Sequence, residues 1–256
     1  MTETVEGAGV ALSADPRGAG PTVLLVHDLA ADGRAWEPLV AALGDGVRTL
    51  AYDRRGYGAS GAPEPYERTT VQEQAEDARA VLERLGADAA DAGAGAGAAD
   101  ASPADAGPLA VGEGFGALIV LDLLVRLPGL LRGAVLVEPP AYQFSNAATA
   151  VLSEQRALLE AALRDGGPAS AVEAWRPGAD DAVRAAHRAF FADFGGLASW
   201  PVTRRELRAV NVPVALVTRS ATPPHLVETT DALAALIPHA RRTADGDALA
   251  ALRALL

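Results

Sequence analysis

Short apolar runs alternate with longer amphipathic segments along most of the 256 residues. Buried parallel strands have continuous apolar sequences, whereas the helices that cover them repeat apolar residues every three to four positions. This alternation predicts the α/β fold class, with a mostly parallel sheet and helices on both faces. Strands are expected at 10–13, 22–26, 48–52, 109–111, 133–137, 213–217 and 240–243. Helices are expected at 36–43, 71–85, 115–127, 151–163, 169–175, 179–194, 226–237 and from 247.

The charged and reactive residue types exclude several kinds of function. The chain has no cysteine, no lysine and only four scattered histidines, so disulfides, thiolate chemistry, lysine Schiff bases, a zinc site and a bound cofactor are not expected. All 22 cations are arginines beside 33 acids, and the net charge of -11 argues against nucleic acid and anionic membranes as partners. Abundant Ala, Gly, Arg and Asp without lysine is typical of a GC-rich bacterial coding sequence.

Targeting signals are not apparent in the sequence. Its first residues, Met1 to Glu6, lack the positive and apolar regions of a signal peptide, and no window reaches about 18 uninterrupted apolar residues. A cytoplasmic protein is therefore expected. Its length and its 50% hydrophobic content suit one α/β domain with a modest insertion.

Two motifs carry a family resemblance. The strand at 22–26 continues into His27-Asp28 and a Trp36-bearing helix, and residues 53–61 read Asp-Arg-Arg-Gly-Tyr-Gly-Ala-Ser-Gly. Together they resemble the α/β-hydrolase superfamily, which pairs a strand ending in His-Gly with a later Asp-x-Arg-Gly-x-Gly-x-Ser turn. Residues 135–140 and 220–224 are similar to a branch of small bacterial members with Glu-Pro-Pro after the sixth strand.

The resemblance implies how the chain is divided. Residues 1–140 and 206–256 would form the α/β-hydrolase core, and residues 141–205 a small helical cap. Residues 87–108, which are almost wholly Ala, Gly, Asp, Ser and Pro, are expected to form a flexible surface excursion.

The family's nucleophile turn has the frame G-x-S-x-G, and residues 112–116 read Gly-Glu-Gly-Phe-Gly. Gly114 therefore stands where the resemblance places the serine, unless these residues form only a generic glycine-rich turn. A glycine cannot form a covalent intermediate.

The family's histidine is missing too, because residues 241–247 form a short connection without one. Residues 218–221, Thr-Arg-Ser-Ala, lack the usual aspartate, which leaves Glu138 as a candidate acid.

Three carboxylates are candidates for catalysis: Asp28, Glu113 and Glu138. The resemblance assigns the oxyanion-stabilising N–H groups to Leu29 and Phe115. Asp28 replaces the family's glycine beside them, where it would repel an oxyanion but could act as a general acid or base; the alternative is a turn-capping role. Glu113 has a structural or surface role as its alternative.

The expected pocket includes two histidines and four aromatic residues. His27 either orients its loop or acts in catalysis, and His225 either points into the pocket or starts a helix. The aromatic residues of the cap could roof an apolar pocket; those expected in it are Tyr142, Phe144, Trp175 and Trp200. Phe190, Phe191 and Phe194 could do the same, or could form only the cap's own core. Arg54 and Arg55 are expected to stabilise their turn.

Three functions remain open from the sequence. The first is a non-hydrolytic enzyme that catalyses cyclisation, dehydration, isomerisation or carbon–carbon cleavage of a hydrophobic small molecule. Analogy with similar proteins of GC-rich bacteria suggests a role in natural-product biosynthesis. The second is a non-catalytic pseudo-hydrolase that binds a ligand, a partner enzyme or a second copy of itself. The third is residual hydrolysis by water that Glu138 activates.

Overall fold

The computed structural model describes residues 1–93 and 107–256, which build an eight-stranded sheet of order β1-β2-β4-β3-β5-β6-β7-β8. β1 and β2 pair antiparallel, as do β2 and β4, and all other pairs are parallel. The predicted mostly parallel sheet is confirmed. The strands are β1 (Glu3–Glu6), β2 (Ala11–Arg17), β3 (Thr22–Val26), β4 (Arg48–Tyr52), β5 (Leu109–Glu113), β6 (Gly133–Val137), β7 (Val214–Val217) and β8 (Ala240–Thr243).

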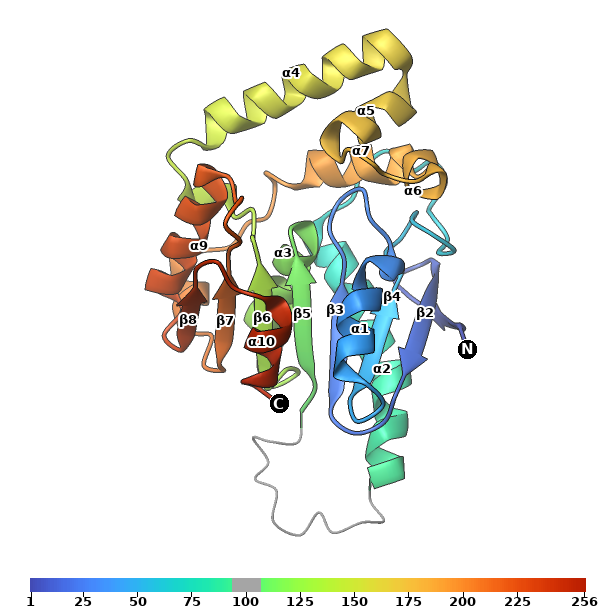
Figure 1. Ribbon diagram of the computed structural model, residues 1–256, viewed down its shortest axis with the longest axis vertical. Coiled ribbons are helices and arrows are strands. Elements are labelled where there is room, and N and C mark those ends of the chain that lie inside the picture. Colours follow the sequence, from blue (N-terminus) through green and yellow to red (C-terminus); the bar gives the residue numbers. More distant parts are fainter. Residues whose placement is uncertain (94–106) are drawn as a thin grey trace.

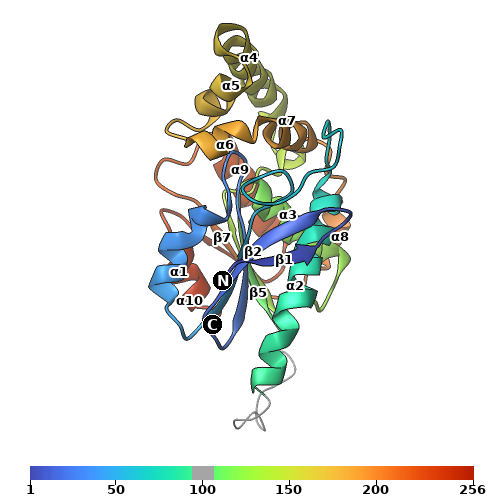
Figure 2. The same ribbon diagram turned by 90° about the vertical axis from the view of Figure 1, so that its right-hand side faces the viewer.

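Helices cover both faces of the sheet, as predicted (Figure 2). On one face lie the short 3-10 helix η1 (Gly33–Trp36), α1 (Glu37–Leu43) and α10 (Ala248–Arg253). On the other lie α2 (Val71–Gly93), α3 (Phe115–Arg126), α8 (Arg204–Arg208) and α9 (Pro224–Leu236). Helix α3 is buried over its first ten residues, because it packs between the sheet and α2.

A helical segment lies across the carboxyl ends of the parallel strands (Figure 1). It contains η3 (Tyr142–Phe144), α4 (Ala148–Gly166), α5 (Pro168–Trp175), α6 (Asp181–Ala185) and α7 (His187–Gly196). The division into a core and a cap at residues 141 and 205 stays a prediction. None of the helices within residues 1–93 and 107–256 combines the length and the apolar character that a membrane span requires.

Several element boundaries differ from the sequence prediction. The strand expected at 10–13 continues as β2 to Arg17. Beyond Ala14 β2 pairs with β4 alone, so the missing N–H of Pro16 leaves no bond to a second strand unmade. The single helix expected at 179–194 is two helices, since Asp180 caps α6 and α7 starts anew at His187. Strand β1 and helix α8 were not expected at all.

The excursion expected at 87–108 is wrong at its start. Helix α2 does not end at Gly86 but continues to Gly93, because the alanine-rich sequence after Gly86 has a high helix propensity. Residues 94–106, on which the rest of that prediction falls, lie outside the described residues.

A buried ion pair joins the helical segment to the sheet. The guanidinium of Arg54, just after β4, lies 2.7 Å from the Asp193 carboxylate on α7, and their side chains are 1% and 0% exposed. Tyr57 donates to the same carboxylate at 2.9 Å, and Gln74 of α2 donates to it as well. The neighbouring Arg55 pairs with Asp77 of α2. The two arginines thus hold three elements together, beyond the turn they were expected to stabilise.

We expect Asp193→Ala to lower the free energy of unfolding by about 3 to 5 kcal/mol, because it removes the carboxylate that pairs with the buried Arg54 charge. Glu160→Ala is the control. It removes an exposed ion pair with Arg156 within α4 and should cost less than about 1 kcal/mol. Urea denaturation measures both values. Equal losses of unfolding free energy would show that the buried pair stabilises the fold no more than the exposed pair does.

Candidate active site

The turn between β5 and α3 is sharp and depends on glycine. β5 ends at Glu113, α3 begins at Phe115, and Gly114 between them has φ 52° and ψ -120°. This left-handed φ is unfavourable for residues with a side chain. A Cβ on Gly116 would lie 2.2 Å from the carbonyl oxygen of Val26, so α3 can approach β3 this closely only with glycine there. The predicted strand–turn–helix frame is present.

The Asp28 carboxylate fills the space beside Gly114. Its Oδ1 accepts a 2.7 Å hydrogen bond from the Phe115 N–H at the N-terminus of α3, where the helix dipole favours negative charge. A Cβ on Gly114 would lie 1.9 Å from the same oxygen. A side chain at position 114 and the carboxylate of Asp28 therefore exclude each other in this arrangement.

The surroundings of Asp28 shift its pKa in both directions. Burial, and after it the nearby negative charge of Glu113, raise the pKa of Asp28 to about 6. Hydrogen bonds from the N–H groups of Phe115 and Leu29 act in the other direction. Of the two N–H groups that the resemblance assigns to an oxyanion, that of Phe115 donates to the Asp28 carboxylate instead. Asp28 is thus poised to exchange a proton close to neutral pH.

A cavity of about 290 Å³ opens above Asp28, between the strand ends and the helical segment. Its polar side chains belong to Asp28, Glu138, Tyr142, Gln155 and His225, and the rest of the wall is mostly apolar. The remaining lining residues are Leu29, Gly114, Pro140, Leu158, Trp175, Leu197, Pro223 and Leu226. The structure therefore brings together much of the predicted site in a space that suits a small molecule.

Comparisons with known proteins agree with this architecture. The family model described as "Alpha/beta hydrolase family" matches residues 23–254. The chain belongs to the alpha/beta hydrolase family.

Sequence relatives of this alpha/beta hydrolase match it only in part. The "Putative non-heme bromoperoxidase BpoC" of Mycobacterium tuberculosis is 32% identical over 148 residues, which are 55% of this chain and 48% of that protein. The "Probable oxidoreductase EphD" of the same species is 32% identical over 85 residues, 33% of this chain and 14% of that protein. The chain thus spans less than half the length of these relatives.

Solved structures match over nearly the whole chain. The esterase EaEST from Exiguobacterium antarcticum has a TM-score of 0.73 at 17% identity, covering 96% of this chain and 91% of its own. An alpha/beta hydrolase from Sphaerobacter thermophilus has a TM-score of 0.66 at 21% identity, and the match covers 99% of this chain and 98% of that protein. At these identities the likeness shows the fold alone.

The other two candidate carboxylates of this alpha/beta hydrolase are paired. Glu138, whose φ is 49°, accepts hydrogen bonds from Thr222 and, at 3.2 Å, from Arg219. Arg219 also lies 2.8 Å from Glu113, which is outside the cavity lining. Among the three candidates, only Asp28 presents its carboxylate to the cavity without an ion-pair partner in the described structure. Arg219 was not predicted as a site residue, although it lies in the turn after β7 where the family's aspartate was expected.

His27 lies behind the site rather than in the cavity lining. It is 1% exposed, its Nδ1 is 2.8 Å from the carbonyl oxygen of Asp28, and its Nε2 accepts from the N–H of Arg54. Burial and the Arg54 charge lower its pKa well below the usual value, so the ring is neutral and Nδ1 is the donor. This is the structural alternative for His27, in which the ring orients the loop after β3.

The aromatic residues divide between the two expected roles. Trp175 and Tyr142 line the cavity, and Tyr142 lies beside His225 with ring centroids 5.9 Å apart. Phe190 and Phe194 pack edge-on against Trp175 and form the core of the helical segment. Phe144 and Trp200 were expected in the pocket, but they lie outside the lining of this cavity. Phe144 packs against the main core, and Trp200 is buried where its Nε1 donates to Asp122.

The connection where the family histidine was sought is short. β8 ends at Thr243 and α10 begins at Ala248, and the residues between them are Ala, Asp, Gly and Asp. The cavity lining also includes Gln155 and Leu158 of α4, which were not predicted because only the three-dimensional fold brings that helix over the strand ends. Within residues 1–93 and 107–256, no three His, Asp or Glu side chains are grouped so that they could hold a metal ion.

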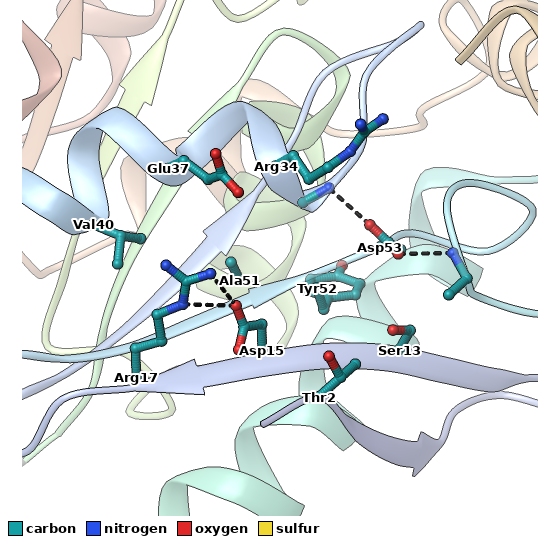
Figure 3. A pocket seen from close by; sticks show the side chains of 12 residues that line it. Thr2, Ser13, Asp15, Arg17, Arg34, Glu37, Val40, Ala51, Tyr52 and Asp53 are labelled. Carbon is teal, nitrogen blue, oxygen red and sulfur yellow. Dashed lines mark hydrogen bonds and ion pairs between the residues drawn. The ribbon is translucent and has the colours of Figure 1, made fainter. Parts of the chain in front are cut away.

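A second hollow of about 280 Å³ lies beside β2, β4 and α1 (Figure 3). Three of its charged side chains, Asp15, Arg17 and Asp53, bind one another or the backbone. Arg17 donates to Asp15 at 2.7 Å, and Asp53 accepts from the N–H groups of Gly33 and Ala59. These contacts hold the three side chains in place, and we place the candidate active site at Asp28.

The exclusion between position 114 and Asp28 can be tested by a double-mutant cycle. Gly114→Ala should lower the free energy of unfolding by about 3 kcal/mol, from overpacking together with the unfavourable φ. In an Asp28→Ala background the same change should cost only about 1 kcal/mol, because the overlap is gone. Denaturant unfolding of the four proteins measures the coupling. Additive effects would refute the proposed overlap.

Proposed function

We propose that this alpha/beta hydrolase is an enzyme that uses Asp28 as a general acid or base on a hydrophobic small molecule, without a covalent intermediate. The observation that carries the proposal is the place of the carboxylate. Asp28 occupies the space beside Gly114, accepts from the Phe115 N–H, and forms part of the lining of an otherwise largely apolar cavity.

The same arrangement disfavours hydrolysis by the family's route. Gly114 offers no nucleophile, and no histidine stands between β8 and α10. An oxyanion would need the Phe115 N–H that already binds Asp28, and it would meet a negative charge there. Water activation by Glu138 is disfavoured as well, because Thr222 and Arg219 hold its carboxylate.

Asp28 is suited to proton transfer in both directions. With a pKa of about 6 it is mostly a carboxylate at neutral pH and can remove a proton from carbon or oxygen. The acid formed can return that proton to another atom of the same ligand. Isomerisation, dehydration, cyclisation and carbon–carbon cleavage all use such a step. The apolar walls would keep water from competing for the proton.

The base can be tested with 5-nitrobenzisoxazole, a neutral apolar probe. A base removes its ring C–H proton, the N–O bond breaks, and a nitrile and a coloured phenolate form. We expect turnover to fall as pH is lowered through about 6, because protonated Asp28 cannot accept the proton. Asp28→Asn should lower the rate by at least about a hundredfold, the lower end of the range usual for one general base.

Asp45→Asn serves as the matched control, since it removes one exposed charge from the turn before β4. Its rate should equal that of the wild type. Equal rates for wild type and Asp28→Asn would contradict the proposal. Hydrolysis of p-nitrophenyl acetate that depends on Asp28 would instead support a hydrolase.

A further inference from the structure

We infer that the cavity takes a cationic ligand with an apolar body, a hydrophobic amine, whose ammonium group pairs with Asp28. The inference deepens the proposed function, because it concerns the same cavity and names the class of molecule that enters it. It rests on the charges around the cavity, on the use of a backbone donor and on the apolar wall.

The charges that face the cavity are predominantly negative. Its lining contains the carboxylates of Asp28 and Glu138 and contains no arginine. The nearby Arg219 is shared between Glu138 and Glu113, so one positive charge offsets two negative ones. Burial lowers the pKa of His225, which therefore adds no positive charge at neutral pH. The net charge of the whole chain is -11, which also favours the approach of cations.

One backbone donor that would hold an anion is already used, because the Phe115 N–H binds Asp28 Oδ1 at 2.7 Å. The neighbouring Leu29 N–H lowers the pKa of the same carboxylate and so favours its charged form. A ligand that enters the cavity meets the negatively charged acceptor instead of the Phe115 N–H. The place where the family resemblance implies N–H groups that bind an oxyanion is therefore occupied here by a negatively charged carboxylate. A carboxylate or an acyl oxyanion is disfavoured, and an ammonium group finds a hydrogen-bonding partner of opposite charge.

The remaining wall suits an apolar body next to that charge. Leu158 and Leu197 lie on the side of the helical segment, and Leu226 lies on α9. Trp175 and Tyr142 add two aromatic rings, which attract cations over their faces. Ligands with a charged end and an apolar end should therefore bind better than ligands that are polar throughout.

Binding should depend on the ionisation of Asp28. The groups that act on this carboxylate are Glu113 at the end of β5, Arg54 after β4 and Tyr142 of η3. Glu138 and His225 complete the titratable groups of the lining. Asp28 loses its charge as pH falls through about 6, so an amine should bind less tightly at about pH 5 than at about pH 8.

Isothermal titration calorimetry with three probes of one shape tests the inference. These are 3-phenylpropylamine, 3-phenylpropanol and 3-phenylpropanoate. At about pH 8 the amine should bind at least about tenfold more tightly than the alcohol, and the carboxylate should bind most weakly. Asp28→Asn should remove the preference for the amine but keep binding of the alcohol, which shows that the variant is folded. Asp45→Asn should behave like the wild type.

Tighter binding of the carboxylate than of the amine, or an amine preference that survives in Asp28→Asn, would overturn the inference. The calorimetry needs no turnover, so its outcome is separate from that of the benzisoxazole assay. Amine binding without proton abstraction would leave the cation site standing and would contradict the enzymatic proposal. Proton abstraction without an amine preference would support the enzymatic proposal and would contradict the cation site.

Discussion

The hydrogen bond from the Phe115 N–H to the Asp28 carboxylate is the contact on which the account of this site depends. It places a negative charge at the N-terminus of α3, a position that the helix dipole favours. It also places the carboxylate where a side chain at position 114 would have to be, which gives the glycine in this turn a physical reason. The Phe115 N–H is used by this placement, and Asp28 contributes a negative charge to the cavity lining. Burial at this position, with the nearby charge of Glu113, raises the pKa of Asp28 although the hydrogen bond lowers it.

The fold holds Asp28 in place from behind. Its carbonyl oxygen accepts from Arg54 at 3.1 Å and lies 2.8 Å from His27 Nδ1. The Arg54 guanidinium lies over the rings of Tyr57 and Phe115 and pairs with Asp193 of α7. The buried pair therefore connects the loop that carries Asp28 with the helical segment that covers the cavity. A stiff support of this kind is what a single proton-transferring group requires.

Much of the fold could be predicted, because apolar runs and amphipathic periodicity report burial directly. The strands β3, β4, β6 and β8 appear within one residue of their expected positions. Gly114 and Asp28 could also be singled out, since both depart from a local motif. The hydrogen bond that brings Asp28 to this turn could not be foreseen, because it joins Asp28 to Phe115, 87 residues away, and depends on the side-chain conformation of Asp28. The roles of Arg219 and Asp193 were missed for the same reason: each finds its partners only across the folded sheet.

An Asp28 that ionises near neutral pH while it binds the N–H of Phe115 should be visible directly in solution. The most direct measurement is an NMR titration that follows the side-chain carboxyl carbon of Asp28 and the amide proton of Phe115 in the same protein. The account predicts that both signals change together with a midpoint near pH 6, because protonation weakens the hydrogen bond they share. An Asp28 midpoint at or below about 4, the ordinary value for aspartate, with no response of the Phe115 amide, would contradict it.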